Sequence, residues 1–429
     1  MKTPYFLIDI DRLEQNLKML RGVMDRTGCK ILLAQKCFSC YTMYPLISKY
    51  LAGATASGIY EARLYRETMD EYVNRGVTNK HGLMLDHKVE NHIFAPAFRE
   101  EDIDEILRIC DHIVFNSPRQ LSLYGQRAKD AGLQIGLRIN PEHSTQEGHA
   151  IYDPCSPGSR LGTTLSQIEE FLNAGDEERR NANRKTFMLL DGLHFHTLCE
   201  QDSDDLESTL DAVVERFGKS LDGTALPECE PMKWINFGGG HHITREGYDI
   251  PRLERCINRM TDMGLQVYLE PGEAVALNAG TLHSSVLEVQ PADADGIQNV
   301  ILDTSAACHM PDVIEMPYTP PLVLPKVVDE DMAGEQSVSV SQGSHTSHHT
   351  YRFGGPTCLS GDVIGTYNIE QELKEGDEVV FGDMAIYSMV KTNTFNGMPL
   401  PDIYLKLDHH GENVVLWKSF TFEDFKSRL

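Results

Sequence analysis

The sequence predicts an α/β protein in which a (β/α)8 TIM-type barrel is combined with a separate C-terminal β domain. Between residues 22 and 275, short apolar segments alternate with segments of helical periodicity. After residue 275 the chain shows strand patterns without helical ones, punctuated by glycine and proline. At 429 residues the chain also exceeds what one hydrophobic core usually covers, so two domains are expected.

The first segment, Tyr5-Phe6-Leu7-Ile8, is expected to form a strand, and leucines at 13, 17 and 20 then share one helix face. Eight apolar strand candidates follow, separated by helical patterns such as 165–172 and 253–263. The candidates lie near residues 31–35, 52–57, 91–95, 112–116, 134–140, 191–196, 233–237 and 266–270. Eight parallel strands with helices between them, over about 240 residues, have the size of a closed barrel.

The β domain is expected to contain several strands after the barrel. They are placed at 285–289, 300–302, 378–381 and 403–407. The segment at Tyr5 is a candidate first strand of the same domain, which would then comprise residues 1–21 and 276–429, with the barrel at 22–275. The polar stretch 329–350, rich in serine and histidine, is expected to be an exposed loop.

Composition limits the possible partners. The formal net charge is −25, from 64 acidic and 39 basic residues, a field that repels nucleic acid and attracts cations. Polycationic small molecules are therefore favoured as substrates, although general solubility also explains an acidic surface. No apolar run is long enough for a membrane span, and Met1-Lys2-Thr3-Pro4 does not begin a secretory signal. We expect a cytoplasmic protein with no membrane or nucleic-acid partner.

Several strand ends carry residues suited to chemistry, because the strand ends on one face of such a barrel assemble its active site. Lys36 follows the first barrel strand and offers an amine, although a lysine there is often only a solvated surface group. Gly238, Gly239 and Gly240 follow the seventh strand, where backbone N–H groups commonly bind phosphate, although three glycines can be merely a flexible turn.

Three further side chains complete the candidate set. Glu270 ends the eighth strand and could accept a pyridinium N–H, or be an ordinary strand-terminal glutamate. His196 could stack on a flat ring, or be a hydrogen-bonded core residue. Cys358 could donate a proton if exposed, or be buried as a small hydrophobe. An amine, a phosphate cradle and a buried carboxylate together predict pyridoxal 5′-phosphate as the cofactor.

Possible metal ligands are also present. They are Cys37 and Cys40, His241 and His242, and the histidines between 345 and 349. A structural zinc site needs two well-spaced pairs, and no second close cysteine pair accompanies the first. We expect no metal.

Short motifs along nearly the whole chain occur in the order of a known family. They are Leu33-Ala34-Gln35-Lys36, Ala95-Pro96-Ala97-Phe98, Asn140-Pro141-Glu142, Pro157-Gly158-Ser159-Arg160-Leu161-Gly162, His194-Phe195-His196-Thr197-Leu198-Cys199-Glu200, residues 236–241, 270–274, His309-Met310-Pro311-Asp312, residues 355–362, and Tyr387 with Thr394-Phe395-Asn396-Gly397. In these motifs the chain resembles the pyridoxal-phosphate decarboxylases of the alanine-racemase fold, the family that includes ornithine and diaminopimelate decarboxylases.

The resemblance implies roles for the candidate residues. Lys36 would hold the cofactor covalently, His196 would stack on its ring, and Glu270 would bind the pyridine nitrogen. The glycines at 238–240 and the hydroxyl of Tyr387 would bind the phosphate. Family members form homodimers with shared active sites, in which Cys358 would donate a proton from the neighbouring subunit.

Within that family the chain is most similar to the branch that acts on carboxylated polyamines, carboxynorspermidine and carboxyspermidine. Glu273 stands where ornithine decarboxylase has a phosphate-binding arginine, so it would face a cationic part of the substrate. The same reasoning applies to Asp312 and Glu315. The segments 67–88 and 329–350 look like insertions relative to shorter family members, and no function is assigned to them. The alternatives are decarboxylation of another diamino acid, such as diaminopimelate or ornithine, racemisation, and a non-catalytic regulator on the same fold.

Overall fold

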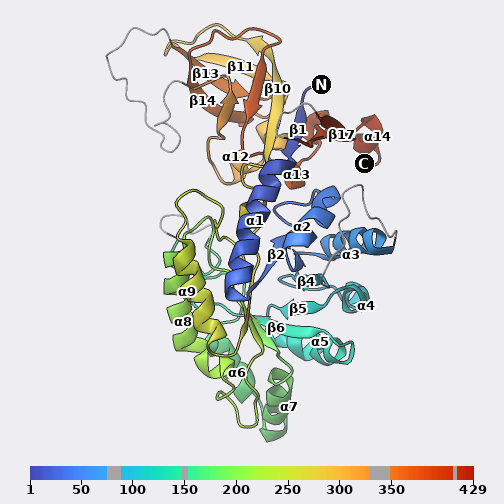
Figure 1. The fold of residues 1–429 in the computed structure, drawn as a ribbon, viewed down its shortest axis with the longest axis vertical. Helices are drawn as coiled ribbons and strands as arrows, with labels where there is room; N and C mark the ends of the chain where they lie inside the picture. The colour runs from blue at the N-terminus through green and yellow to red at the C-terminus, as the bar shows by residue number, and fades with distance from the viewer. Residues whose placement is uncertain (75–87, 147–152, 328–347, 409–412) are drawn as a thin grey trace. The chain divides into compact units, whose positions relative to one another are not determined.

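The computed structural model describes residues 1–74, 88–146, 153–327, 348–408 and 413–429 (Figure 1). Most of both predicted insertions and His345 lie outside the described residues. The chain divides into two compact units. The barrel unit is Glu14–Val275, and the sheet unit combines Met1–Leu13 with Ala276–Leu429. The sequence placed these divisions at 21/22 and 275/276.

The barrel unit contains a closed barrel of parallel strands, β2 to β9. They are β2 (Lys30–Ala34), β3 (Gly53–Ala56), β4 (Glu90–Phe94), β5 (His112–Phe115), β6 (Gln134–Arg138), β7 (Gly192–His194), β8 (Trp234–Asn236) and β9 (Gln266–Leu269). The barrel closes where β2 pairs with β9, with Lys30 opposite Tyr268. Each of the eight strand candidates from the sequence coincides with one of these strands, and the predicted fold class is confirmed.

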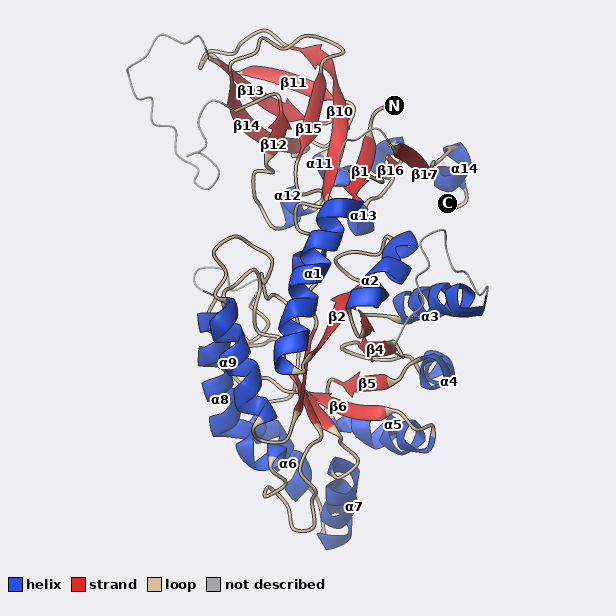
Figure 2. Cartoon of the chain, in the orientation of Figure 1, coloured by secondary structure: helices blue, strands red, loops and turns tan. Residues whose placement is uncertain are grey.

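Helices lie outside the strands of the barrel unit (Figure 2). They are α1 (Ile10–Thr27), the 3-10 helix η1 (Tyr41–Met43), α2 (Tyr44–Tyr50), α3 (Ile59–Asn74), α4 (Glu100–Ile109), α5 (Pro118–Asp130), α6 (Leu165–Asn173), α7 (Glu177–Phe187), α8 (Ser203–Leu221), α9 (Ile250–Thr261) and α10 (Glu273–Ala276). In α9, Asp249 caps the first turn by accepting from Arg252 N, and Leu253, Ile257 and Met260 are buried at helical spacing. No helix among the described residues is long and apolar enough to cross a membrane.

Trp234 of β8 is buried in the core of the barrel unit, and two glycines make room for it. A Cβ atom on Gly192 would lie 2.1 Å from Trp234 Cδ2, and one on Gly136 would lie 2.4 Å from its Cη2. The indole packs with Leu32, Val114 and Tyr268 in one buried cluster. The small residues on β6 and β7 are therefore a packing requirement of this core.

The sheet unit is built on one large sheet whose main path runs β14-β13-β11-β10-β1-β16-β17, with β15 joining β10 to β12. The strands are β1 (Tyr5–Asp9), β10 (Gly280–Val289), β11 (Gln298–Leu302), β12 (Leu322–Leu324), β13 (His349–Gly354), β14 (Val363–Ile369), β15 (Glu378–Phe381), β16 (Asp402–Lys406) and β17 (Val414–Lys418). The opening strand β1 lies in this sheet, antiparallel to β10 and parallel to β16.

Short helices interrupt the strands of the sheet unit, so the expectation of strands without helices was wrong. They are α11 (Ala306–His309), α12 (Asp312–Glu315), α13 (Ser388–Lys391), the 3-10 helix η3 (Phe395–Gly397) and α14 (Phe422–Lys426). Four of the five have three or four residues, which is too short for helical periodicity to be visible in the sequence. The predicted site residues Asp312 and Glu315 lie in α12, and Tyr387 immediately precedes α13.

Candidate active site

The carboxyl ends of the barrel strands bring four predicted elements of the site together. Lys36 follows β2 and is exposed, His196 follows β7, the three glycines follow β8, and Glu270 follows β9. Because the strands are parallel in a closed barrel, these positions surround one mouth. Direct contacts support this placement, since Gly239 N donates to His196 Nδ1 at 3.1 Å. This mouth is the candidate site of the barrel unit.

Glu270 is a buried carboxylate held ionised by its neighbours. Asn236 Nδ2 donates to its Oε1 at 2.8 Å, and His194 Nε2 lies 3.4 Å from its Oε2. Burial by itself would raise the pKa of Glu270, but these contacts outweigh burial and lower the pKa to about 2. A buried ionised carboxylate at the mouth can accept a hydrogen bond from a ring N–H, which fits the pyridine nitrogen of pyridoxal phosphate.

His196 is a neutral imidazole in this arrangement. Burial, together with the charges of Lys36 and Arg138, lowers its pKa well below the usual value. Its Nδ1 accepts from Gly239, so the neutral ring carries its proton on Nε2. A neutral flat ring beside a lysine suits stacking on an aromatic cofactor.

The glycine run allows a close approach of two loops. Gly238 and Gly240 have φ values of 71° and 84°, and a Cβ atom on them would lie 2.4 Å from Phe195 O and 2.1 Å from Leu198 O. The N–H groups of Gly238 and Gly239 already donate to Asn236 Oδ1 and His196 Nδ1. Gly238 and Gly239 therefore shape the turn and orient neighbouring side chains of the site. The binding of phosphate by the N–H groups of all three glycines stays a prediction.

Arg138 is a member of the site that the sequence reasoning missed. It ends β6, its Nη2 donates to His196 O at 3.2 Å, and its guanidinium lies 4.6 Å from the centroid of the Phe94 ring. Burial lowers its pKa to about 10, so it remains a cation at neutral pH. Its hydrogen-bond partner is a carbonyl oxygen and its ring contact is Phe94, so the cation is suited to an anionic group of a ligand. Because arginines are mostly exposed, the sequence around a strand-terminal arginine does not indicate that this one is buried.

Glu273 begins α10 and has a histidine partner that the sequence did not predict. Its Oε2 lies 2.9 Å from His242 Nε2, and both side chains are largely buried. Burial by itself would lower the pKa of His242, but the hydrogen bond and charge of Glu273, with the charge of Glu200, raise it. Glu273 is therefore already paired with His242, and its binding of a substrate ammonium stays a prediction.

Cys358 lies in the sheet unit, exposed in the turn between β13 and β14. Asp362 holds this turn in place, because its Oδ2 accepts from Thr357 Oγ1 at 2.6 Å and from Ser305 Oγ at 2.9 Å. Its Oδ1 also accepts from Ala307 N at 3.2 Å. The exposed thiol is thus presented on a turn that is tied to α11.

Asp312 and Glu315 begin and end α12 in the same unit, and both pair with Lys391 of α13. Tyr387 precedes α13 with a φ of 54°, a left-handed conformation that is uncommon outside glycine. The Lys391 ammonium lies 5.7 Å from the centroid of the Tyr387 ring. The structure thus groups the predicted residues Asp312, Glu315 and Tyr387 around one lysine.

A second cluster of possible metal ligands lies inside the barrel. Side-chain ligand atoms of Glu90, His92 and His112 lie within 4.8 Å of one another. The two imidazole rings stack at 3.8 Å with planes 10° apart, so their in-plane lone pairs run side by side instead of converging on one ion. Lys30 Nζ already lies 2.5 Å from Glu90. We assign no metal here, and the expectation of a protein without metal stays a prediction.

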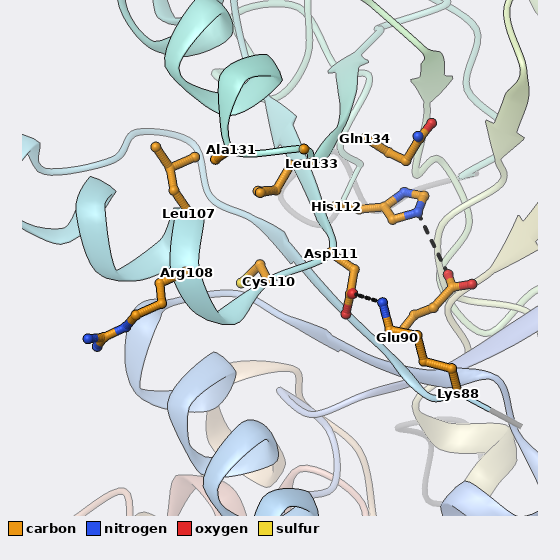
Figure 3. Close-up of a pocket in the computed structure, with 11 residues that line it drawn as sticks. Lys88, Glu90, Leu107, Arg108, Cys110, Asp111, His112, Ala131, Leu133 and Gln134 are labelled. Carbon is orange, nitrogen blue, oxygen red and sulfur yellow. Dashed lines mark hydrogen bonds and ion pairs between the residues drawn. The ribbon is translucent and has the colours of Figure 1, made fainter.

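A surface cavity of about 460 Å³ lies beside this cluster, at the amino ends of β4, β5 and β6 (Figure 3). Its lining includes Glu90, Asp111, His112 and Gln134, and Lys88 pairs with Asp111 at its edge. The predicted cofactor residues follow the carboxyl ends of the strands, which is the opposite end of a parallel barrel. This cavity is therefore distinct from the candidate active site.

Comparison with known proteins identifies the family. Residues 23–385 match the family described as "Pyridoxal-dependent decarboxylase, C-terminal sheet domain". The chain is 37% identical over 430 residues to the carboxynorspermidine/carboxyspermidine decarboxylase of Campylobacter jejuni, covering 100% of this chain and 98% of the relative. It is 33% identical over 431 residues to the carboxyaminopropylagmatine decarboxylase of Synechocystis, covering 100% of this chain and 96% of that relative.

A solved structure agrees with these relatives. The crystal structure of carboxynorspermidine decarboxylase complexed with norspermidine, from Campylobacter jejuni, superposes with a TM-score of 0.79 at 35% identity and covers 100% of both chains. The predictions of an enzyme, of pyridoxal phosphate as its cofactor and of this fold are confirmed by these matches and by the barrel-and-sheet architecture. The chain belongs to the pyridoxal-dependent decarboxylases.

Proposed function

We propose that this enzyme removes the carboxyl group of a carboxylated polyamine, carboxynorspermidine or carboxyspermidine, to give norspermidine or spermidine. The observation that carries the proposal is similarity along the whole chain, at 35% identity, to a carboxynorspermidine decarboxylase crystallised with norspermidine. The net charge of −25 supports it, because an acidic protein attracts a polycationic substrate.

Bound pyridoxal phosphate supplies an electron sink for the electron pair that remains on carbon when carbon dioxide leaves. The residues of the barrel mouth are suited to hold this group. The Lys36 amine would hold it covalently, ionised Glu270 would accept its ring N–H, and neutral His196 would lie against its face. Glycines 238–240 and the Tyr387 hydroxyl would bind its phosphate.

The remaining roles concern protons and the substrate. The exposed Cys358 thiol would protonate the substrate carbon after carbon dioxide has left, and we propose that it does so in a homodimer with shared active sites. Glu273, Asp312 and Glu315 would bind ammonium groups of the substrate, each charge-assisted hydrogen bond contributing about 1.5–3 kcal/mol. A cytoplasmic location also stays a prediction.

Steady-state release of carbon dioxide from a panel of substrates tests the proposal. The panel contains carboxynorspermidine, carboxyspermidine, carboxyaminopropylagmatine, diaminopimelate and ornithine. We expect the first two to have the highest kcat/KM. The similarity to the Synechocystis enzyme makes carboxyaminopropylagmatine the second candidate. Preference for that compound, or for either diamino acid, would replace the proposed substrate.

A further inference from the structure

Three charged residues of the sheet unit form an ionic cluster that bears on substrate binding. It consists of Asp312, Glu315 and Lys391, and we refer to it as the Lys391 cluster. The Lys391 ammonium donates to Asp312 Oδ1 and, at 2.9 Å, to Glu315 Oε2. The side chain of Asp312 is only 12% exposed, whereas that of Glu315 is 59% exposed. The two carboxylates predicted to receive a substrate ammonium are thus already occupied by an ammonium of the chain itself.

Lys391 remains charged in this environment. Partial burial by itself would lower its pKa, but the hydrogen bonds and charges of Asp312 and Glu315 outweigh burial and raise the pKa. With the carboxylates ionised, the Lys391 cluster carries a net charge of −1 from two anions and one cation. Without Lys391 the same carboxylates would carry −2.

The surroundings fix this lysine next to other predicted site residues. Lys391 is the last residue of α13, and Asn393, two residues on, bonds to α11 through Cys308 O at 2.9 Å and Ala307 O at 2.8 Å. Ala307 in turn donates to Asp362, which holds the Cys358 turn. Hydrogen bonds to α11 therefore hold the chain two residues beyond Lys391, and the ammonium itself is held by Asp312 and Glu315.

We propose that Lys391 is a specificity-determining residue that competes with the terminal ammonium of the polyamine for Asp312 and Glu315. This inference rests on the proposed role of those carboxylates in substrate binding. A ligand gains from the cluster only if it brings an ammonium that replaces or shares the contacts of Lys391, so a polyamine without the terminal charge gains nothing.

The competition has an electrostatic signature. Two ammonium groups that share the same carboxylates repel each other, so removal of the lysine charge should lower the Kd of a polyamine by roughly three- to tenfold at low salt. The repulsion is screened by ions, because the screening length falls from about 10 Å at 0.1 M salt to about 3 Å at 1 M. The difference between the original enzyme and the uncharged variant should therefore shrink as salt is added.

Calorimetry with norspermidine and the cofactor-loaded enzyme tests the inference. We expect Lys391→Met to bind norspermidine more tightly at low salt, and Lys391→Arg, which keeps the charge, to restore the original affinity. Dipropylamine, which lacks both terminal amines of norspermidine, should show no difference in affinity between the two enzymes. Thermal unfolding verifies that each variant is folded, and Lys391→Gln replaces Lys391→Met if that variant is not.

Asp312→Asn separates the inference from the role on which it rests. If this variant binds norspermidine more weakly while Lys391→Met binds it equally or more weakly, Lys391 only positions Asp312 and the competition is refuted. If Asp312→Asn binds norspermidine unchanged, the carboxylate does not receive the polyamine, and both the binding role and the inference fail. Turnover of carboxynorspermidine, measured separately, decides the proposed reaction in either case.

Discussion

His242 Nε2 and Glu273 Oε2 lie 2.9 Å apart in a largely buried pair formed between the loops that follow β8 and β9. Glu273 is one residue beyond the Pro271-Gly272 turn, and His242 is two residues beyond the glycine run. The pair therefore connects the loop of the predicted phosphate site to the loop that carries Glu270. Burial by itself would lower the pKa of His242, but Glu273 raises it above the ordinary histidine value of about 6.5, so the charge of the pair changes with pH.

The first prediction concerns the pH dependence of this pair. Because the folded pKa of His242 is raised, its contribution to stability is fully present below the ordinary histidine pKa and is lost as pH rises through the raised value. Glu273→Gln should therefore lower the free energy of unfolding by about 1–3 kcal/mol at low pH, as expected for a buried group that loses its partner. The deficit should shrink as pH rises.

Denaturant unfolding measures the difference in free energy of unfolding between the original protein and Glu273→Gln. The pH series runs from about 5.5 to about 8.5, which brackets the ordinary histidine pKa. The His242 resonance, followed by NMR, should titrate at lower pH in Glu273→Gln than in the original protein. Glu170→Gln, an exposed change on α6, is the matched control. A stability difference that does not vary with pH would show that Glu273 does not raise the pKa of His242.

The second prediction is that Lys36→Ala abolishes both catalysis and covalent retention of the cofactor. Lys36 is exposed at the barrel mouth beside neutral His196, so its amine is accessible to the aldehyde of the cofactor. The visible absorbance of the bound cofactor should be lost after dialysis of the variant. Lys185→Ala, an exposed lysine on α7, should retain it.

Borohydride reduction of the original enzyme, followed by peptide mapping, should label Lys36. A label on another lysine would refute its assignment. A protein that retains no cofactor at all would favour the non-catalytic regulator that the resemblance left open.

The third prediction concerns Glu270. Glu270→Gln keeps the shape of the side chain but removes the charge that a pyridinium N–H would meet, a charge-assisted contact of about 1.5–3 kcal/mol. This corresponds to a loss of roughly ten- to more than hundredfold in kcat/KM. The measurement is the rate of carbon dioxide release, with Glu170→Gln again as control. Activity within about twofold of the original enzyme would exclude the pyridine contact.

The sequence predicted the barrel strands well because each is a short apolar run that ends in a turn, as buried parallel strands require. β17 was missed, although Val414, Val415, Leu416 and Trp417 also form a short apolar run; in the structure the last three of these side chains are exposed. The β12, β13 and β14 strands were also missed, the last two on either side of the turn that carries Cys358.

The candidate site could be predicted only where it depends on local position. Lys36, His196 and Glu270 follow barrel strands, so the strand pattern alone places them at one mouth. Contacts between side chains could not be predicted in this way. His242 and Glu273 are 31 residues apart in the sequence, and Lys391 and Asp312 are 79 residues apart. Nothing in a single sequence reports such contacts, which depend on how loops from different strands meet. For the same reason, the burial of Arg138 could not be predicted.

The last prediction tests the core that supports the barrel mouth. Gly192→Ala places a methyl group 2.1 Å from Trp234 Cδ2, inside the van der Waals radius of the indole ring. Because Trp234 is packed between Leu32, Val114 and Tyr268, the ring cannot move aside without disturbing its neighbours. We expect the free energy of unfolding to fall by about 1–3 kcal/mol or more through overpacking. Thermal and denaturant unfolding measure this loss.

Gly58→Ala provides the matched control for that substitution. A Cβ atom there would meet no atom within 4 Å, and the backbone at Gly58 is not left-handed. The same glycine-to-alanine change should therefore leave stability unchanged or raise it by about 0.4–1 kcal/mol through the unfolded state. Equal effects of the two substitutions would show that Trp234 is not held as tightly as its contacts indicate. A loss of stability in Gly192→Ala but not in Gly58→Ala would show that the close packing of the Trp234 indole against β7 requires glycine at position 192.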